Sequence, residues 1–174
     1  DEALIIGTYL PKRVDILLQI SMGQFPKIRP PPESHKIRPD LAMRNKWGLT
    51  TNSTDMFYQF LLEMIPKQLP TVYLEGYKTL VETTKTLPWP SKPKVIFTAN
   101  LFQFCEVFQA WAAEKIEAGT PLIIGQHGGF YGVGKWHCGE EHQVKIADRF
   151  ITWGWSDDRP SVYPGFALTN VGKP

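Results

Sequence analysis

Short apolar runs that alternate with helical patterns most constrain how this chain can fold. From residue 94 onward the order is an apolar run at 94–99, a helical pattern at about 102–118, a second run at 122–125, a helix from about residue 140 and a third run at 150–153. Asn100 can cap the helix at 102–118, and its expected buried stripe is Phe104, Val107, Phe108, Trp111 and Ala112. Strands that alternate with helices in this way are typical of a parallel sheet with helices packed on it. We therefore predict an α/β fold, a Rossmann-like three-layer domain with a mostly parallel sheet.

The first half of the chain has weaker patterns. A strand is expected at 3–9, and a helix from Pro11 to Gly23 in which residues 14, 17, 18 and 22 keep helical spacing. Two further helices are expected near 53–65, with Ser53 or Thr54 as the cap, and at 72–87. The first would form an apolar face of Phe57, Phe60, Leu61, Met64 and Ile65, and the second would turn Leu74, Tyr77 and Val81 inward. Residues 24–39 hold five prolines, including three in succession, so this segment cannot be a helix or a central strand. It is either a plain extended connector or a recognition segment. We treat residues 1–174 as a single domain that contains this proline-rich loop.

The overall composition excludes several classes of protein. The formal net charge is +2 and the basic residues are scattered, which argues against a nucleic-acid partner. Two cysteines do not make a disulfide framework, and a reducing compartment is expected. No apolar run reaches the roughly 20 residues that span a bilayer. We predict neither a transmembrane segment nor a signal peptide.

The most informative stretch is 121–155, where His127 directly follows the expected strand 122–125. Ligands bind at the carboxyl ends of strands in open α/β sheets. Gly128 and Gly129 follow the histidine, and their lack of side chains lets a substrate approach the main chain closely. Imidazole titrates near neutral pH and can take a proton from a hydroxyl. His127 is therefore a candidate general base, although a strand-end histidine can also be satisfied by hydrogen bonds alone.

A glycine-rich loop follows, and its chemistry is less specific. The segment Gly132-Val133-Gly134-Lys135 lacks the spacing of a phosphate-binding loop, so it is either a weak phosphate site or a flexible surface loop. Glu140 and Glu141 lie at an expected helix start. They either complement the helix dipole or orient His127 and bind sugar hydroxyls.

A metal site is an alternative for the same stretch, and its four candidate ligands are His127, His137, Cys138 and His142. Zinc accepts such ligands, but His137 and His142 are five residues apart and would not share one helix face. We predict no metal.

Trp153 either stacks on a sugar ring or closes the edge of the domain. The candidate catalytic residues are His127, Glu140 and Glu141, and the candidate substrate-binding residues are Gln126, Gly128, Gly129, Tyr131, Lys135, His142 and Trp153.

Several motifs together resemble a known family. Gln126-His127-Gly128-Gly129, Tyr131-Gly132, Glu141, Asp148 and Thr152-Trp153-Gly154-Trp155 resemble the transferases of bacterial O-antigen and surface-carbohydrate gene clusters, and Leu74-Glu75-Gly76-Tyr77 and 96–100 look like earlier landmarks of that family. The resemblance covers most of residues 65–155. More distantly, the Gln-His-Gly turn is similar to one in GT-B-type polymer transferases that handle CDP-glycerol and Kdo.

The resemblance implies a GT-B architecture, in which two Rossmann-like domains face a cleft. This chain would be the N-terminal, acceptor-side half. A donor-nucleotide domain is expected to follow Pro174, so that this segment alone would not turn over substrate. The donor would be a nucleotide-activated sugar, the acceptor a glycan or a lipid-linked glycan, and no resident cofactor is expected. The expected location is the cytoplasm, with peripheral association with the inner face of the bacterial inner membrane as an open alternative.

Three functions from different classes follow. The first is a glycosyltransferase of bacterial surface polysaccharide biosynthesis, which transfers a sugar or related group and uses His127 as its base. The second is a metal-dependent hydrolase that uses the histidine and cysteine cluster. The third is a non-catalytic module that binds a glycan or a partner chain on its aromatic surface.

Overall fold

The computed structural model describes residues 2–172. The sequence predicts one Rossmann-like domain, and the structure divides the chain into two compact units. The first combines residues 2–33 with residues 87–172, and the second spans Ser34–Thr86. The proline-rich segment 24–39 contains no helix or strand, as expected, and one of the two boundaries between the units, at 33/34, falls within it.

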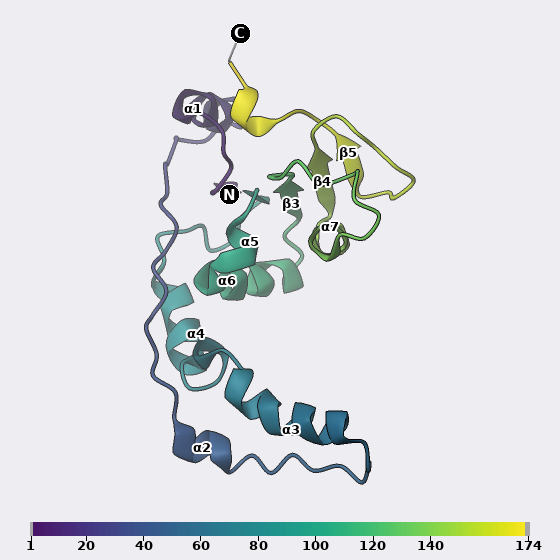
Figure 1. Cartoon of the computed structure of the whole chain (residues 1–174). Helices are drawn as coiled ribbons and strands as arrows, with labels where there is room; N and C mark the ends of the chain where they lie inside the picture. The colour runs from purple at the N-terminus through teal and green to yellow at the C-terminus, as the bar shows by residue number, and fades with distance from the viewer. Residues whose placement is uncertain (1, 173–174) are drawn as a thin grey trace. The chain divides into compact units, whose positions relative to one another are not determined.

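The first unit is built on a parallel sheet, drawn as arrows in Figure 1. Its strands are β1 (Leu4–Ile5), β2 (Ile96–Thr98), β3 (Leu122–Gly125), β4 (Arg149–Thr152) and β5 (Val162–Pro164). Their order in the sheet is the order in the chain, and each neighbouring pair is parallel. The predicted α/β class with a parallel sheet is confirmed. The short strand β5 was not predicted, because a three-residue run that ends in proline has no distinct pattern.

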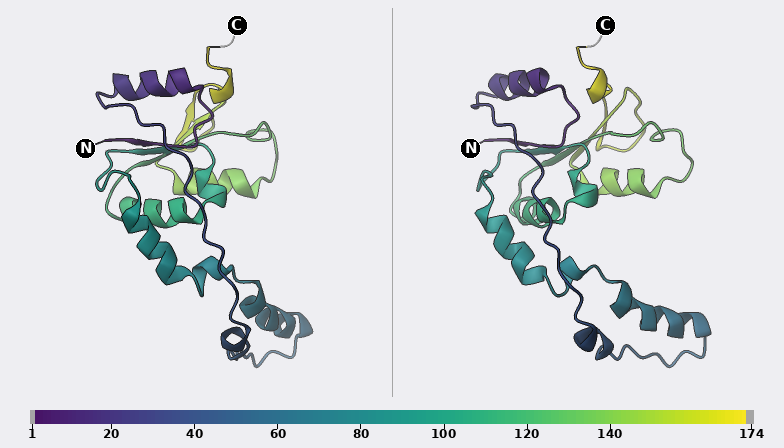
Figure 2. Two further views of the ribbon diagram at one scale, coloured as in Figure 1. Left: turned by 90° about the vertical axis from the view of Figure 1, so that its left-hand side faces the viewer. Right: turned by 60° about the vertical axis from the view of Figure 1, so that its left-hand side comes forward.

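Helices cover both faces of this sheet and complete three layers. Helix α1 (Lys12–Ser21) lies on one face, and α5 (Leu101–Phe104), α6 (Glu106–Glu117) and α7 (Cys138–Ile146) lie on the other, as Figure 2 shows in two views. The largest fully buried side chains come from the strands and from the faces of the helices that meet them, and they include Leu4, Ile96, Ile124, Phe150, Val107 and Phe108. Burial of such side chains on both faces is what a parallel sheet requires.

The helix predicted at 102–118 is interrupted. Cys105 has an extended backbone, with φ −118° and ψ 94°, and separates α5 from α6. The interruption turns Phe104 out to solvent, where it is 57% exposed, so its predicted place in the buried stripe is wrong. The predicted burial of Val107, Phe108, Trp111 and Ala112 is confirmed. The helix stops before Gly119, whose φ of +93° suits glycine.

Helix α1 is held to its surroundings by a polar side chain as well as by apolar contacts. Leu17 and Met22, which were noted for their helical spacing, are exposed. Gln19 is instead fully buried, where its Oε1 accepts a hydrogen bond from the Lys27 amide at 2.9 Å and its Nε2 donates to Asp15 at 2.8 Å. A buried amide requires such partners. Gln19 therefore fixes the start of the proline-rich segment against the helix.

The second unit is helical. It contains α2 (Leu41–Asn45), α3 (Met56–Gln68), a short 3₁₀ turn η1 (Thr71–Tyr73) and α4 (Tyr77–Thr86). Asp55, rather than Ser53 or Thr54, caps α3, because its carboxylate accepts from the Phe57 amide. The apolar face expected on α3 is largely exposed, and Tyr77, expected to point inward, is 57% exposed. No helix of the described residues is long and apolar enough to cross a membrane.

A buried ion pair organises the second unit. The Arg44 guanidinium donates two hydrogen bonds to the Glu75 carboxylate, at 2.6 and 2.7 Å, and two more to the carbonyls of Pro66 and Leu69, each at 2.9 Å. Both charged side chains are almost fully shielded from solvent. Gly76 follows Glu75 in the chain and packs closely on Ile37. A Cβ atom at position 76 would lie 2.7 Å from the Ile37 side chain, which is too close for an ordinary contact. The Leu74-Glu75-Gly76-Tyr77 motif thus joins α2, the end of α3 and α4.

Replacing Glu75 by glutamine should lower the unfolding midpoint at neutral pH, because Arg44 would lose its charged partner. Hydrogen bonding from Arg44 lowers the pKa of Glu75 to about 2 from its ordinary value of 4.5. The stabilisation is therefore present above pH 4.5 and is lost as the pH falls toward 2. Urea unfolding of both proteins across this pH range measures the effect.

The matched control is Glu63→Gln, which removes an exposed pair with Lys67 within the same unit. Exposed pairs contribute little, so this variant should unfold close to the wild type. Equal midpoints for Glu75→Gln and the wild type at neutral pH would contradict the role given to Arg44 and Glu75.

Candidate active site

The candidate site lies at the carboxyl edge of the sheet. Because all five strands are parallel, the residues that follow each strand meet at one edge. β1 leads into Tyr9, β2 into Asn100, β3 into Gln126 and His127, and β4 into Trp153. Residues that lie more than a hundred positions apart in the sequence are thereby brought to the same place.

Gln126 connects the ends of β3 and β4. Its side chain is 2% exposed, and its Oε1 accepts hydrogen bonds from the Trp153 amide and the Trp155 indole, each at 2.8 Å. Its Nε2 donates to the Gly128 carbonyl at 2.6 Å. Its own carbonyl accepts from the Trp153 indole at 2.9 Å. Gln126 was predicted to bind substrate, but the structure engages its side chain fully within the protein.

The same network explains two further motif residues. Trp153 is oriented by Gln126 through both its amide and its indole nitrogen. The Trp155 ring packs so closely over Gly132 that a Cβ there would lie 2.8 Å from it, and Gly132 has φ +76°. Only glycine meets both requirements without strain.

His127 lies among aromatic rings and is half-buried. Its ring centroid lies 5.4 Å from Tyr131, 6.4 Å from Phe102 and 6.5 Å from Tyr9. Its Nδ1 is buried and has no hydrogen-bond partner among the described residues. An unpaired buried nitrogen is unusual in a protein, which makes this imidazole a candidate for contact with a ligand.

Burial controls the protonation of His127. It lowers the pKa below the ordinary value of 6.5, because the charged form loses solvation. The nearby backbone of Ala99 opposes this shift, and the adjacent His137 adds to it. The imidazole is therefore neutral at neutral pH, which is the form that accepts a proton.

The two candidate carboxylates have other partners. Glu140 is buried, and its carboxylate accepts from the Gly132 amide at 2.7 Å and from Arg159 at 2.6 Å. Glu141 is exposed and lies 3.7 Å from Lys145 on the same helix. No described contact joins either carboxylate to His127. Both lie in the first turn of α7, where negative charge complements the helix dipole.

His137 caps α7, because its Nδ1 accepts from the Glu140 amide at 2.9 Å. Its ring also packs on Tyr131, with 4.6 Å between centroids. Tyr131 is buried and accepts a hydrogen bond from Gln143. The glycine loop is thus closed onto α7, and Tyr131 is the predicted substrate-binding residue that contacts His127.

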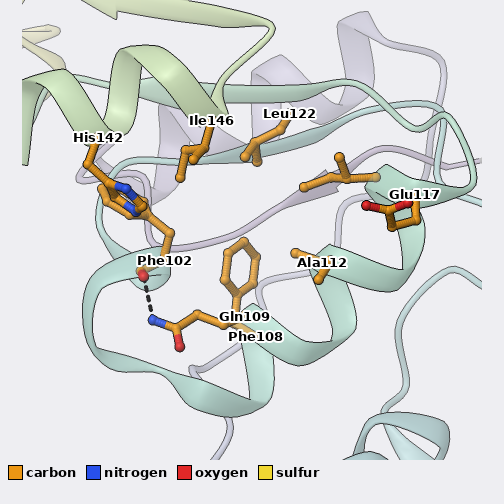
Figure 3. Close-up of a pocket in the computed structure, with 10 residues that line it drawn as sticks. Phe102, Phe108, Gln109, Ala112, Glu117, Leu122, His142 and Ile146 are labelled. Carbon is orange, nitrogen blue, oxygen red and sulfur yellow. Dashed lines mark hydrogen bonds between the residues drawn. The ribbon is translucent and has the colours of Figure 1, made fainter. Parts of the chain in front are cut away.

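Lys135 and His142 lie elsewhere. Lys135 is exposed, with its Nζ 4.7 Å from the centre of the Trp136 ring. His142 lines an apolar cavity of about 570 Å³, shown in Figure 3, together with Phe102, Phe108 and Ile146. Phe102 lines this cavity and also contacts His127. Phe102 therefore links the cavity that His142 lines to the candidate site.

The alternative metal cluster is not assembled. Across residues 2–172 no three histidine, cysteine, aspartate or glutamate side chains lie close enough together to hold a metal ion. His137 is used as a helix cap, and His142 points into the apolar cavity. The hydrolase hypothesis loses the ligand set on which it depended.

Comparison with protein families places this site in context. The model of the LIC12162 family transferases matches residues 1–173. The chain belongs to this family. Searches among curated proteins and among solved structures found no match. The transferase class predicted from the motifs is confirmed at the level of the family.

Sequence reasoning missed several residues that the structure places at or next to the candidate site. Tyr9 and Asn100 are joined by a hydrogen bond of 2.6 Å, Phe102 contacts His127, and Arg159 holds Glu140. Asn100 was considered only as a helix cap, yet its side chain makes no cap hydrogen bond. Tyr9 is the last residue of the expected strand 3–9, and this carboxyl-end position was the available signal, since that edge is where ligands bind.

Gln126→Leu should lower the free energy of unfolding by roughly 2–4 kcal/mol, since it leaves the Trp153 amide, the Trp155 indole and the Gly128 carbonyl without partners. Guanidinium unfolding followed by tryptophan fluorescence measures the loss. Wild-type stability in Gln126→Leu would contradict the central role of this amide.

Proposed function

We propose that this LIC12162 family transferase is a glycosyltransferase of bacterial surface polysaccharide biosynthesis, and that His127 is its general base. The observation that carries the proposal is the placement of His127: a half-buried imidazole at the carboxyl edge of the parallel sheet, with its pKa lowered and Nδ1 unpaired. The motif resemblance to transferases of O-antigen gene clusters supports the pathway.

In the proposed reaction His127 takes the proton of an acceptor hydroxyl. The oxygen then attacks the anomeric carbon of a nucleotide-activated sugar, and the bond from that carbon to the phosphate breaks. The nucleotide leaves with the bonding electron pair. Base assistance of this kind contributes about 10²–10⁴-fold to the rate. The aromatic rings around His127 exclude water from the base and keep it neutral.

The rest of the proposed machinery follows from the GT-B resemblance. Gly128 and Gly129 have little side-chain bulk, so their backbone can approach the acceptor. The donor nucleotide would be held by a second Rossmann-like domain, and its charge neutralised there by helix N-termini and cationic groups. The donor is a substrate, and no resident cofactor is needed. The acceptor would be a glycan or a lipid-linked glycan.

His127→Ala should reduce kcat by about 10²–10⁴-fold in the natural full-length enzyme, because the acceptor hydroxyl loses its base. Transfer from nucleotide-sugars to the acceptor is the measurement. His35→Ala is the control, since this exposed histidine of the second unit contacts only Thr83 in the described hydrogen bonds. Near-normal turnover by His127→Ala would remove the histidine from the base role.

The pH profile gives a separate test. A base must be neutral, so activity should fall as the pH drops through the pKa of His127. Because burial lowers that pKa, the midpoint of the acid limb of kcat/KM should lie below the ordinary 6.5. Rate measurements at saturating donor from roughly two pH units below to roughly two above the ordinary value of 6.5 would locate it. A midpoint above 6.5 would contradict the assignment.

A further inference from the structure

Tyr9 has a backbone conformation that a tyrosine rarely adopts. Its φ is +59°, and it is the single non-glycine residue with a positive φ among residues 2–172. A bulky side chain in this region is strained, and such strain clusters at ligand-binding positions. The turn that contains it is held by Gly7, also at positive φ, and by the Thr8 hydroxyl, which accepts from the Leu10 amide. The strained residue is therefore fixed by its neighbours.

The phenol of Tyr9 is held with its proton free. Asn100 donates from Nδ2 to the Tyr9 hydroxyl oxygen at 2.6 Å. A phenol can accept one hydrogen bond and donate another. Because Asn100 occupies the accepting side, the O–H can donate to a ligand. Tyr9 is 46% exposed, so a ligand can reach it.

Tyr9 also lies beside the proposed base. Its ring is within 18° of parallel to the His127 ring, with 6.5 Å between centroids. One side chain follows β1 and the other follows β3, so the sheet edge presents a phenol donor and a neutral imidazole next to each other. A sugar matches this pair, because its hydroxyls accept and donate hydrogen bonds and its C–H face packs on aromatic rings.

We propose that Tyr9 binds the acceptor sugar: its O–H donates to a hydroxyl oxygen of that sugar, and Asn100 positions the phenol. This inference rests on the proposed function and identifies where the acceptor sits at the His127 site. Tyr9 is the substrate-contacting residue, and Asn100 is a positioning residue.

The experiment uses the natural full-length protein and methyl glycosides of glucose, galactose, mannose and rhamnose, detected by saturation-transfer NMR. Tyr9→Phe keeps the ring and removes the O–H, and it should weaken binding of the best glycoside by about 5–10-fold, the loss expected for one hydrogen bond. Asn100→Asp should act similarly, because its carboxylate would accept the phenol proton. Tyr163→Phe, a tyrosine of similar exposure on β5, is the matched control and should bind like the wild type.

Tyr9→Gly separates binding from folding. Glycine accepts a positive φ, so this variant should keep or raise the unfolding midpoint while it loses glycoside binding. A markedly lower midpoint would show a structural role and overturn the proposal. So would unchanged binding in Tyr9→Phe, or no binding of any glycoside by the wild type.

The glycoside-binding test of Tyr9 and the turnover test of His127 can fail independently of each other. Full turnover by His127→Ala, with glycoside binding lost in Tyr9→Phe, would reject the base and support the sugar subsite. Lost turnover by His127→Ala, with binding retained in Tyr9→Phe, would support the base and reject the subsite.

Discussion

The buried carboxamide of Gln126 is the interaction on which the candidate site depends. Removed from water, it must find partners for both its oxygen and its nitrogen, and it finds them in the main chain at 128 and 153 and in the indole of Trp155. These partners lie on two strand ends and in the loop between them. The Gln-His-Gly-Gly and Thr-Trp-Gly-Trp motifs are therefore two halves of one hydrogen-bonded arrangement. Its effect is to hold His127, the next residue, at the sheet edge.

The polar residues of the site divide by how completely the protein satisfies them. Gln126, Glu140 and His137 hold the glycine loop and the start of α7 through hydrogen bonds within the protein. His127 keeps an unpaired buried nitrogen, and Tyr9 keeps a phenol proton. Side chains whose hydrogen bonds are made within the protein hold the loop in place. A side chain with an unused donor or acceptor can form a hydrogen bond to a substrate. This difference favours His127 and Tyr9 over the carboxylates as the residues that act on the acceptor.

Much of the sheet could be predicted from local pattern. The run 122–125 was located to the residue, and the stripe on α6 was correct from Val107 onward. The errors have a common cause. Phe104, Tyr77 and the apolar face of α3 follow helical spacing, yet they are exposed. Helical spacing predicts which residues share a face of a helix. Whether another element packs on that face depends on the tertiary structure.

The alternation of strand and helix by itself determined a parallel α/β sheet, and the position of His127 after a strand indicated the carboxyl edge as the candidate site. The side-chain partners were decided only by tertiary structure. Glu140 and Glu141 are neighbours in sequence, yet one is buried against Arg159 and the other faces solvent. Tyr9 and His127 are far apart in the chain and lie side by side in the fold. The physical reason is that hydrogen bonds and ring contacts depend on distances across strands, which no local spacing records.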